Sequence, residues 1–473
     1  MDARPSQAQT PSRPGAVDVS GLQASVRRFH GWEPLRVEGE IPAGLVGTLV
    51  RTGPGLLERF GRRLAHAFEA DGALQAVRLA GDGTASGAVR LVESPGYREE
   101  QAAGRPLYGS ATSRWRRISN GLAGRTKTTG NTNVMQWQGG LLALMEGGRP
   151  VEIDPRSLDT GEVSDLGGVL GAAFSAHPHA VGDTTFNFGQ QWGRRAGLRI
   201  YALPRRGAAR ELGHVTMPWN TMMHDFGVTG RHAAFLVCPA KLRLGKALLG
   251  SADFLGMFAW DPDSHAELLV VDLDAIDRPI RVELPARWVF HVANAFCRDE
   301  HLTIDWVEYP DFSTFAALSA NQPDTEVAPP RVRRVTVDLR RRALHGEQTL
   351  WDQVCDFPVL PPARVGREYS TSWYSTGGSR LSGGIARLHV GSGAVDRWTL
   401  GPGHHVSEPV FVPRPEAKRD DEGWLLAMVH DGEAVESYVA VLDADRPSAG
   451  PLAQIWMGQA LPVTFHGTFI ADA

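Results

Sequence analysis

The feature that most constrains the fold of this chain is a repeated alternation of short apolar runs and turn residues. From about residue 35 onward, β-branched or aromatic runs are divided by Gly, Pro, Asp and Asn, as in GTLVRTGPG, GGLLALMEGGRP and ELLVVDLDAIDRP. The 53 glycines and 31 prolines favour tight turns over helices. Many short strands over so long a chain predict an all-β closed propeller, which protects its sheet edges by radial repetition. No WD or kelch signature is present, so repeats do not give the blade count.

Composition restricts the classes of function. The apolar content of 42%, the net charge of −4 and the pI near 6.5 describe a globular chain without the basic footprint of a nucleic-acid-binding protein. The three cysteines are too far apart for a disulfide framework or zinc cluster and fit a reducing cytoplasm. Residues 1–20, rich in Pro, Ser and Gln, are predicted to be a disordered tail, and residues 21–473 a single domain. No apolar run is long enough to span a bilayer, and no protein partner is predicted.

Two stretches interrupt the strand pattern. Residues 101–129 are polar, basic and partly compatible with helix, and residues 238–260 combine apolar side chains with cations. Such a combination is typical of a segment that lies in a membrane interface, and a buried helix or loop is the alternative. The residues expected to contact the membrane are Leu242, Leu244, Leu248, Leu249, Phe254 and Leu255.

Four of the 16 histidines share one environment, an apolar run followed by small or turn-forming residues. They are His177 in SAHPHAVGD, His224 in MMHDFGVT, His291 in WVFHVANAF and His466 in LPVTFHGTFI. A histidine at a strand end is more often a surface or core residue, and these separations are far longer than those of zinc ligand pairs. Long separations are natural, however, if each histidine comes from a different blade and points at the axis. We therefore predict that the four imidazoles bind one Fe(II), which neutral imidazole suits.

Histidine ligands need acceptors on their second ring nitrogen. Three carboxylates in apolar contexts are candidates: Glu146 in LLALMEGG, Asp356 in VCDFPVL and Glu408 in HHVSEPVFV. Burying a carboxylate is costly unless it is paired, which favours a role at the site. His177 and His179 could also form an H-x-H zinc pair, although Pro178 and the lack of a nearby third ligand argue against it.

These motifs occur in an order that resembles the carotenoid cleavage oxygenase family, and most closely its bacterial apocarotenoid oxygenases. The resemblance runs from GLVGTLVRTGPGLLERFGRRLAHAFEADGAL through GNTNVMQWQGGLLALMEGG, SAHPHA, MMHDFGVT, VFHVANAF, CDFPV and SEPVFVPRP to FHGTF. It implies a seven-bladed propeller, with loops or short helices as a cap over an axial Fe(II) held by the four histidines. It also implies that Glu146, Asp356 and Glu408 hold those histidines. The family has Glu where this chain has Asp356, so a backbone shift or a water is expected to make up the shorter reach to its histidine, expected to be His291.

The same resemblance implies the reaction. Four histidines leave two positions of an octahedral Fe(II) open for dioxygen beside a substrate double bond, and oxidative cleavage gives two carbonyl products. Thr132 in GNTNV matches a family threonine near the open position. An apolar tunnel would select the bond that is cut, with candidate lining residues Met145, Met222, Phe290 and Phe357.

The residue before Glu146 bears on the substrate. Family members that cleave stilbenes and phenylpropanoids have a lysine there and a tyrosine that hold a phenol, whereas this chain has Met145. An apolar, adaptable side chain favours a carotenoid or apocarotenoid, cleaved to retinal-like aldehydes and taken from a membrane through residues 238–260. A cytoplasmic protein bound peripherally to the membrane is expected. The alternatives are a stilbene-cleaving dioxygenase, a retinoid isomerase-like member of the family, and a non-catalytic binding propeller.

Overall fold

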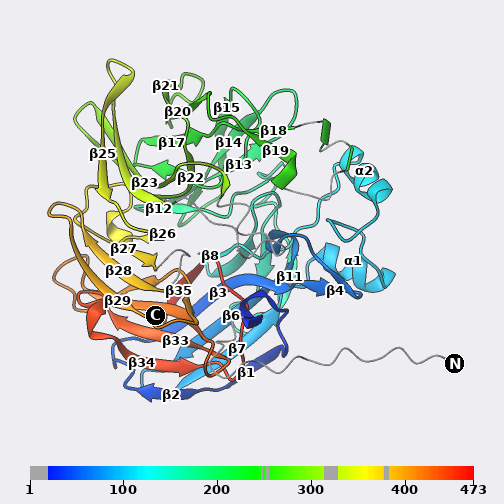
Figure 1. Cartoon of the computed structure of the whole chain (residues 1–473), viewed down its shortest axis with the longest axis vertical. Helices are drawn as coiled ribbons and strands as arrows, with labels where there is room; N and C mark the ends of the chain where they lie inside the picture. The colour runs from blue at the N-terminus through cyan, green and yellow to red at the C-terminus, as the bar shows by residue number, and fades with distance from the viewer. Residues whose placement is uncertain are drawn as a thin grey trace.

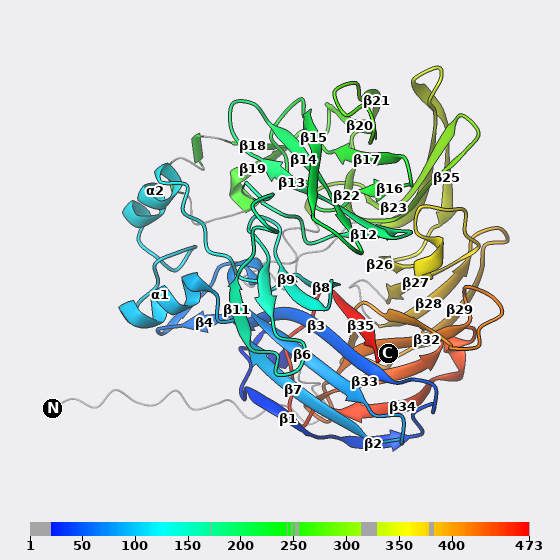
Figure 2. The same cartoon turned by 180° about the vertical axis from the view of Figure 1, so that it is seen from behind.

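The strands form a closed ring of sheets. The computed structural model describes residues 20–171, 173–243, 245–246, 249–250, 255–313, 329–377 and 383–472. Within these ranges, seven sheets of four to six strands surround a common axis (Figures 1 and 2). The seven-bladed propeller implied by the resemblance is therefore confirmed. The division into a tail and one domain stays a prediction, since residues 1–19 lie outside these ranges.

The blades follow one another along the chain, and each is an antiparallel sheet. The first joins β1 (His30–Pro34), β3 (Gly47–Leu56), β6 (Asp71–Leu79), β7 (Ala85–Leu91) and β35 (Gly467–Ala471). The second joins β8 (Asn133–Trp137), β9 (Gly140–Leu144), β10 (Val151–Ile153) and β11 (Thr160–Val163). The third joins β12 (His179–Val181), β13 (Thr184–Gln191), β14 (Gly197–Pro204) and β15 (Arg210–Thr216). The fourth joins β16 (Gly227–Val228), β17 (His232–Val237), β20 (His265–Asp272) and β21 (Ile280–Pro285).

The remaining blades complete the ring. The fifth joins β22 (Trp288–Arg298), β23 (His301–Tyr309), β24 (Arg331–Asp338) and β25 (Ala343–Trp351). The sixth joins β26 (Cys355–Val359), β27 (Thr371–Thr376), β28 (Gly384–His389) and β29 (Ala394–Thr399). The seventh joins β2 (Arg36–Gly39), β30 (His404–Val406), β31 (Val410–Pro413), β32 (Gly423–Asp431), β33 (Glu436–Asp443) and β34 (Pro451–Trp456). Two short pairs lie outside the blades, β4 (Glu58–Arg59) with β5 (Arg62–Arg63) and β18 (Ala240–Leu242) with β19 (Phe258–Trp260).

Two exchanges of strands close the ring. The N-terminal β2 pairs with β34 of the seventh blade, and the C-terminal β35 pairs with β3 of the first, with Leu49 opposite Phe469. The core lies between facing blades, where Leu49 and Val77 of the first pack with Leu426 and Val441 of the seventh. Strand β3 is buried almost throughout because both its faces are covered.

The helices lie outside the ring. α1 (Pro95–Ala103) and α2 (Arg114–Leu122) both start after a serine whose hydroxyl accepts a backbone N–H, and α1 ends at Gly104 in the left-handed conformation. In both views α1 lies beside β4 and β11 (Figures 1 and 2). Among the described residues no helix combines the length and apolar character needed to span a bilayer.

A buried network of charges connects α1 to the propeller. Arg59 Nη1 lies 3.1 Å from Asp71 Oδ2 and 2.6 Å from Glu100 Oε2. Lys127 Nζ contacts the same two carboxylates at 2.7 and 2.8 Å. Because two cations face two carboxylates, no member carries an uncompensated buried charge.

We expect Glu100→Gln to lower the free energy of unfolding by about 3 kcal/mol, because Arg59 and Lys127 would share one remaining carboxylate. Urea unfolding followed by fluorescence measures the change. The matched control is Glu99→Gln on the same helix, since Glu99 is half exposed and pairs with Arg125 in solvent. Equal losses in both variants would contradict a special role for the buried network.

Candidate metal centre

Each of the seven blades places one polar residue shortly before, or within, the edge strand nearest the axis. In ring order these residues are His466 before β35, Thr132 before β8, His177 before β12, His224 before β16, His291 in β22, Asp356 in β26 and Glu408 before β31. The labels of β35, β8, β12 and β26 lie around the centre of Figure 1. The long separations of the histidines in the sequence therefore correspond to positions on four blades around one axis.

The four predicted histidines meet there. All are buried, with exposed fractions of 5–7%, and one ligand nitrogen from each lies within 4.8 Å of the others. The Nε2 atoms of His177 and His224 are 3.0 Å apart, and those of His224 and His291 are 3.4 Å apart. Burial and the neighbouring rings hold the pKa of His177 well below its usual range, which favours the neutral form that binds metals.

The three predicted carboxylates lie behind three of these rings. Glu146 Oε1 is 3.1 Å from His224 Nδ1, Asp356 Oδ1 is 2.7 Å from His291 Nδ1, and Glu408 Oε1 is 2.9 Å from His466 Nδ1. Each contact is made at Nδ1, which leaves Nε2 for the common centre. The contacts of Asp356 and Glu408 are hydrogen bonds, whereas Glu146 lies beside His224 Nδ1 without forming one. Four imidazoles with carboxylates behind them form a donor set that fits a divalent transition-metal ion.

Asp356 reaches His291 directly despite its short side chain. Its Oδ2 accepts a 2.6 Å hydrogen bond from Tyr309, and its Oδ1 accepts one of 2.8 Å from the N–H of Phe357. Burial raises the pKa of Asp356, but the His291 ring and these hydrogen bonds outweigh burial and hold the pKa below its usual value. Phe357 has φ of 55° and the pairing of β26 with β27 is irregular there. Asp356 Oδ1 lies 2.7 Å from His291 Nδ1, so the contact is direct.

Glu408 has a buried counter-charge that the sequence analysis missed. Arg51 of β3 is fully buried, and its Nη1 lies 3.7 Å from Glu408 Oε2. Its Nε and Nη2 donate at 2.8 Å to the Thr464 hydroxyl and the Phe465 carbonyl, just before His466. Burial lowers the pKa of Arg51 to about 10, and Glu408 opposes that decrease. Arg51 could have been found in the sequence, because it is a charged residue within the apolar run GTLVRTGPG, just as the three carboxylates lie in apolar runs.

His179 does not join the metal centre. Its Nε2 lies 2.7 Å from Asp225 Oδ1, and it is absent from the group of converging ligand atoms. The H-x-H zinc pair is therefore not formed. The sequence analysis also missed Asp225, although it directly follows His224.

The other predicted site residues lie at different distances from the centre. Thr132 is buried, accepts a 3.1 Å hydrogen bond from His466 N on its carbonyl, and donates its hydroxyl to Asn131. The Phe357 ring is 4.8 Å from His291 and 5.5 Å from His466, and the buried Phe290 ring is 5.4 Å from His224. Met145 Sδ accepts from Thr129 N at 3.1 Å.

Met222 is buried in an apolar cluster that also contains Phe290. The catalytic role of Thr132 and the tunnel role of Met145, Met222, Phe290 and Phe357 stay predictions.

The predicted membrane segment is described only in part. β18 and β19 pair with Ala240 opposite Trp260 and bring the two ends of the segment together. Leu242 is partly buried against the core, and Leu249 is 59% exposed. Leu255 begins a 3₁₀ turn, Leu255–Met257. Leu244, Leu248 and Phe254 lie outside the described residues.

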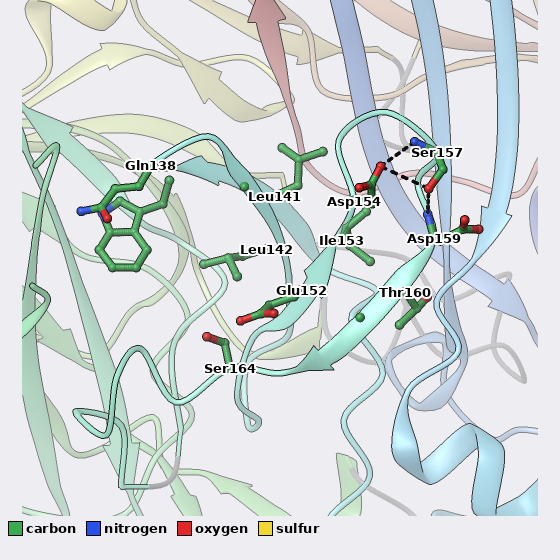
Figure 3. A pocket seen from close by; sticks show the side chains of 13 residues that line it. Gln138, Leu141, Leu142, Glu152, Ile153, Asp154, Ser157, Asp159, Thr160 and Ser164 are labelled. Carbon is green, nitrogen blue, oxygen red and sulfur yellow. Dashed lines mark hydrogen bonds between the residues drawn. The ribbon is translucent and has the colours of Figure 1, made fainter.

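A surface pocket of about 650 Å³ lies on the second blade (Figure 3). Trp137, Leu142, Glu152 and Ser164 line it, and Asp154 there accepts hydrogen bonds from the backbone and hydroxyl of Ser157. None of the four histidines lines this pocket, so it is not part of the metal centre.

Comparison with known proteins agrees with this geometry. The family model described as retinal pigment epithelial membrane protein matches residues 24–471. Apocarotenoid-15,15'-oxygenase of Synechocystis is 31% identical, and the match covers 95% of each chain. Lignostilbene-α,β-dioxygenase isozyme III of Sphingomonas paucimobilis is 28% identical over 96% of this chain and 98% of that protein. The structure of cobalt-substituted Synechocystis apocarotenoid oxygenase superimposes with a TM-score of 0.87 at 30% identity, covering 96% of this chain and 98% of that one.

The chain therefore belongs to the retinal pigment epithelial membrane protein family, the family of the carotenoid cleavage oxygenases. It is an oxygenase of that family.

We expect Asp356→Asn to weaken metal binding roughly 10- to 100-fold, because a single amide oxygen cannot accept from His291, Tyr309 and Phe357 together. Competition with a fluorescent chelator measures the dissociation constant. The control is Asp352→Asn, which makes the same chemical change at an exposed residue just before β26. An unaltered dissociation constant in folded Asp356→Asn protein would show that this carboxylate does not support the site.

Proposed function

We propose that this protein is a non-haem Fe(II) dioxygenase that cleaves one conjugated C=C bond of an apocarotenoid or carotenoid. One dioxygen and one R–CH=CH–R′ unit give R–CHO and R′–CHO, so all atoms balance. The observation that carries the proposal is the convergence of four buried imidazoles, three of them backed by carboxylates. When bound, iron would supply the redox chemistry with dioxygen.

In this proposal, the residues of the chain hold the metal, orient the histidine rings and shield the substrate from water. Asp356 and Glu408 hydrogen-bond His291 and His466, and Glu146 lies 3.1 Å behind His224, so these carboxylates are assigned to support of the rings and not to base or nucleophile chemistry. This agrees with a reaction that needs no proton transfer from the protein. The rings of Phe290 and Phe357 lie against the histidines and give the substrate an apolar surface that excludes water.

One observation favours a polyene over a phenolic stilbene. Met145 stands where stilbene cleavers of the family have lysine, and its sulfur accepts from the Thr129 N–H. No cation at position 145 is therefore available for a phenolate. A stilbene-cleaving enzyme is the second candidate, because the relative named lignostilbene dioxygenase covers nearly the whole chain.

Peripheral membrane attachment is also proposed, through α2 and the Leu249 turn. Trp115 and Leu122 are 80% and 77% exposed, and their seven-residue spacing puts them on one side of α2. The turn packs on that helix, since Arg114 and Arg117 donate to the carbonyls of Leu249 and Gly250. Exposed apolar side chains among arginines suit an interface that contains anionic lipid.

Aerobic incubation of the Fe(II)-loaded protein with an apocarotenal is expected to give two carbonyl fragments. A hydroxystilbene tested in parallel should stay intact. Mass spectrometry of the products identifies the bond that is cut. Cleavage of the stilbene alone would select the second candidate. Conversion of a retinyl ester without oxygen uptake would select an isomerase.

A Trp115→Ser/Leu122→Ser double variant should sediment with liposomes several-fold less than wild type, because it removes apolar area from the proposed contact. Turnover of detergent-solubilised substrate should not change. Leu344→Ser on β25, also an exposed leucine, is the control. Membrane attachment at this surface is wrong if both proteins sediment as wild type does.

A further inference from the structure

His177 differs from the other three histidines in its support. Its carboxylate contacts are 3.7 Å from Nε2 to Glu146 and 3.9 Å from Nδ1 to Asp225, beyond hydrogen-bonding distance. The other three rings each have a carboxylate oxygen within 3.1 Å of Nδ1. Some other constraint must therefore fix His177 relative to its neighbours.

Asp225 connects the segments that carry three of the histidines. It follows His224, and its Oδ1 lies 2.7 Å from Nε2 of His179, two residues after His177. Its Oδ2 accepts a 2.7 Å hydrogen bond from the N–H of Val292, the residue after His291. One buried carboxylate thus bonds the third blade to the fourth and the fourth to the fifth at the level of the ligands.

These bonds are not ordinary sheet pairing. The pairing of β22 with β23 is irregular on both sides of Val292, and the Val292 N–H donates across the blades to Asp225. Asp225 Oδ1 also accepts from the N–H of Phe226 at 2.7 Å, so both oxygens are engaged and the carboxylate is held in one orientation. Because its side chain is only 3% exposed, water competes little for these bonds.

We propose that Asp225 and His179 form a positioning pair that sets the spacing of His177, His224 and His291 before the metal binds. A preorganised ligand set raises metal affinity, because binding then costs less ordering of the ligands. This role goes beyond the proposed reaction but rests on the proposed metal centre. Neither residue touches the metal position, so both are positioning residues.

The test compares metal affinity with the stability of the metal-free protein. Asp225→Asn keeps the size of the side chain. Its amide nitrogen, however, must face the N–H of either Phe226 or Val292, and it cannot accept the hydrogen bond that the carboxylate oxygen accepted there. His179→Gln removes the ring at a partly exposed edge, with the side chain 24% exposed, and leaves Asp225 bonded to Val292. The control is Asp272→Asn, because Asp272 ends β20 of the same blade and accepts from Arg231 near the surface.

The dissociation constant for Co(II) is measured without oxygen by chelator competition, and thermal unfolding is measured on metal-free samples. We expect Asp225→Asn to raise the constant roughly 10- to 100-fold, His179→Gln to raise it several-fold, and Asp272→Asn to leave it unchanged. The Asp225→Asn/His179→Gln double variant should bind Co(II) no more weakly than Asp225→Asn alone, because both substitutions break the same Asp225–His179 contact.

A purely structural pair would lower the unfolding temperature of the metal-free protein and leave the dissociation constant of the folded protein unchanged. That result overturns the proposal. If Asp225→Asn fails to fold, His179→Gln decides: wild-type affinity in this variant overturns the proposal too. If wild-type protein binds neither Co(II) nor Fe(II), the metal centre itself is wrong and this inference falls with it. Metal binding by wild type together with unaffected variants refutes the positioning role alone.

Discussion

The metal centre depends on the pairing that closes the propeller ring. β35 pairs with β3, and the backbone of Thr52 exchanges hydrogen bonds of 3.0 Å with Phe465 and His466. His466 therefore takes its place only when the two ends of the chain have joined the first blade. Arg51 of β3 strengthens this junction, since it holds the Thr464–Phe465 segment and faces Glu408 of the seventh blade. Closure of the ring and completion of the ligand set therefore depend on the same strand pairing.

Electrostatics also favours a cation at this centre. Four carboxylates, of Glu146, Asp225, Asp356 and Glu408, surround the histidines, and Arg51 is the buried cation beside them. Buried carboxylates cost free energy unless a positive charge or hydrogen bonds compensate them. Imidazoles supply hydrogen bonds to Asp225, Asp356 and Glu408, and a divalent ion among the four histidines would supply balancing charge. The acids thus serve two purposes, to orient the rings and to make the axis favourable for a cation.

The sequence predicted individual site residues but not the contacts that join residues of different blades. The turn pattern predicted a propeller. Apolar neighbours identified the four histidines and the three acids behind them, because burying a polar side chain costs free energy unless it has a partner. The number of blades came from the resemblance to a family, since the blades have no repeated sequence motif from which they could be counted. The partners of Arg51, Tyr309 and Asp225 come from different blades. Their contacts follow from tertiary geometry, which no local pattern encodes.

The short connection between Asp356 and Phe357 links the metal ligands to the substrate surface. A positive φ is unfavourable for phenylalanine, and the Phe357 N–H bond to Asp356 Oδ1 helps to hold it. That same oxygen accepts from His291, while the Phe357 ring lies against His291 and His466. Asp356 Oδ1 thus contacts a ligand ring and the backbone N–H that carries the neighbouring Phe357 ring. The orientation of His291 and the position of the Phe357 ring are therefore coupled through one carboxylate oxygen.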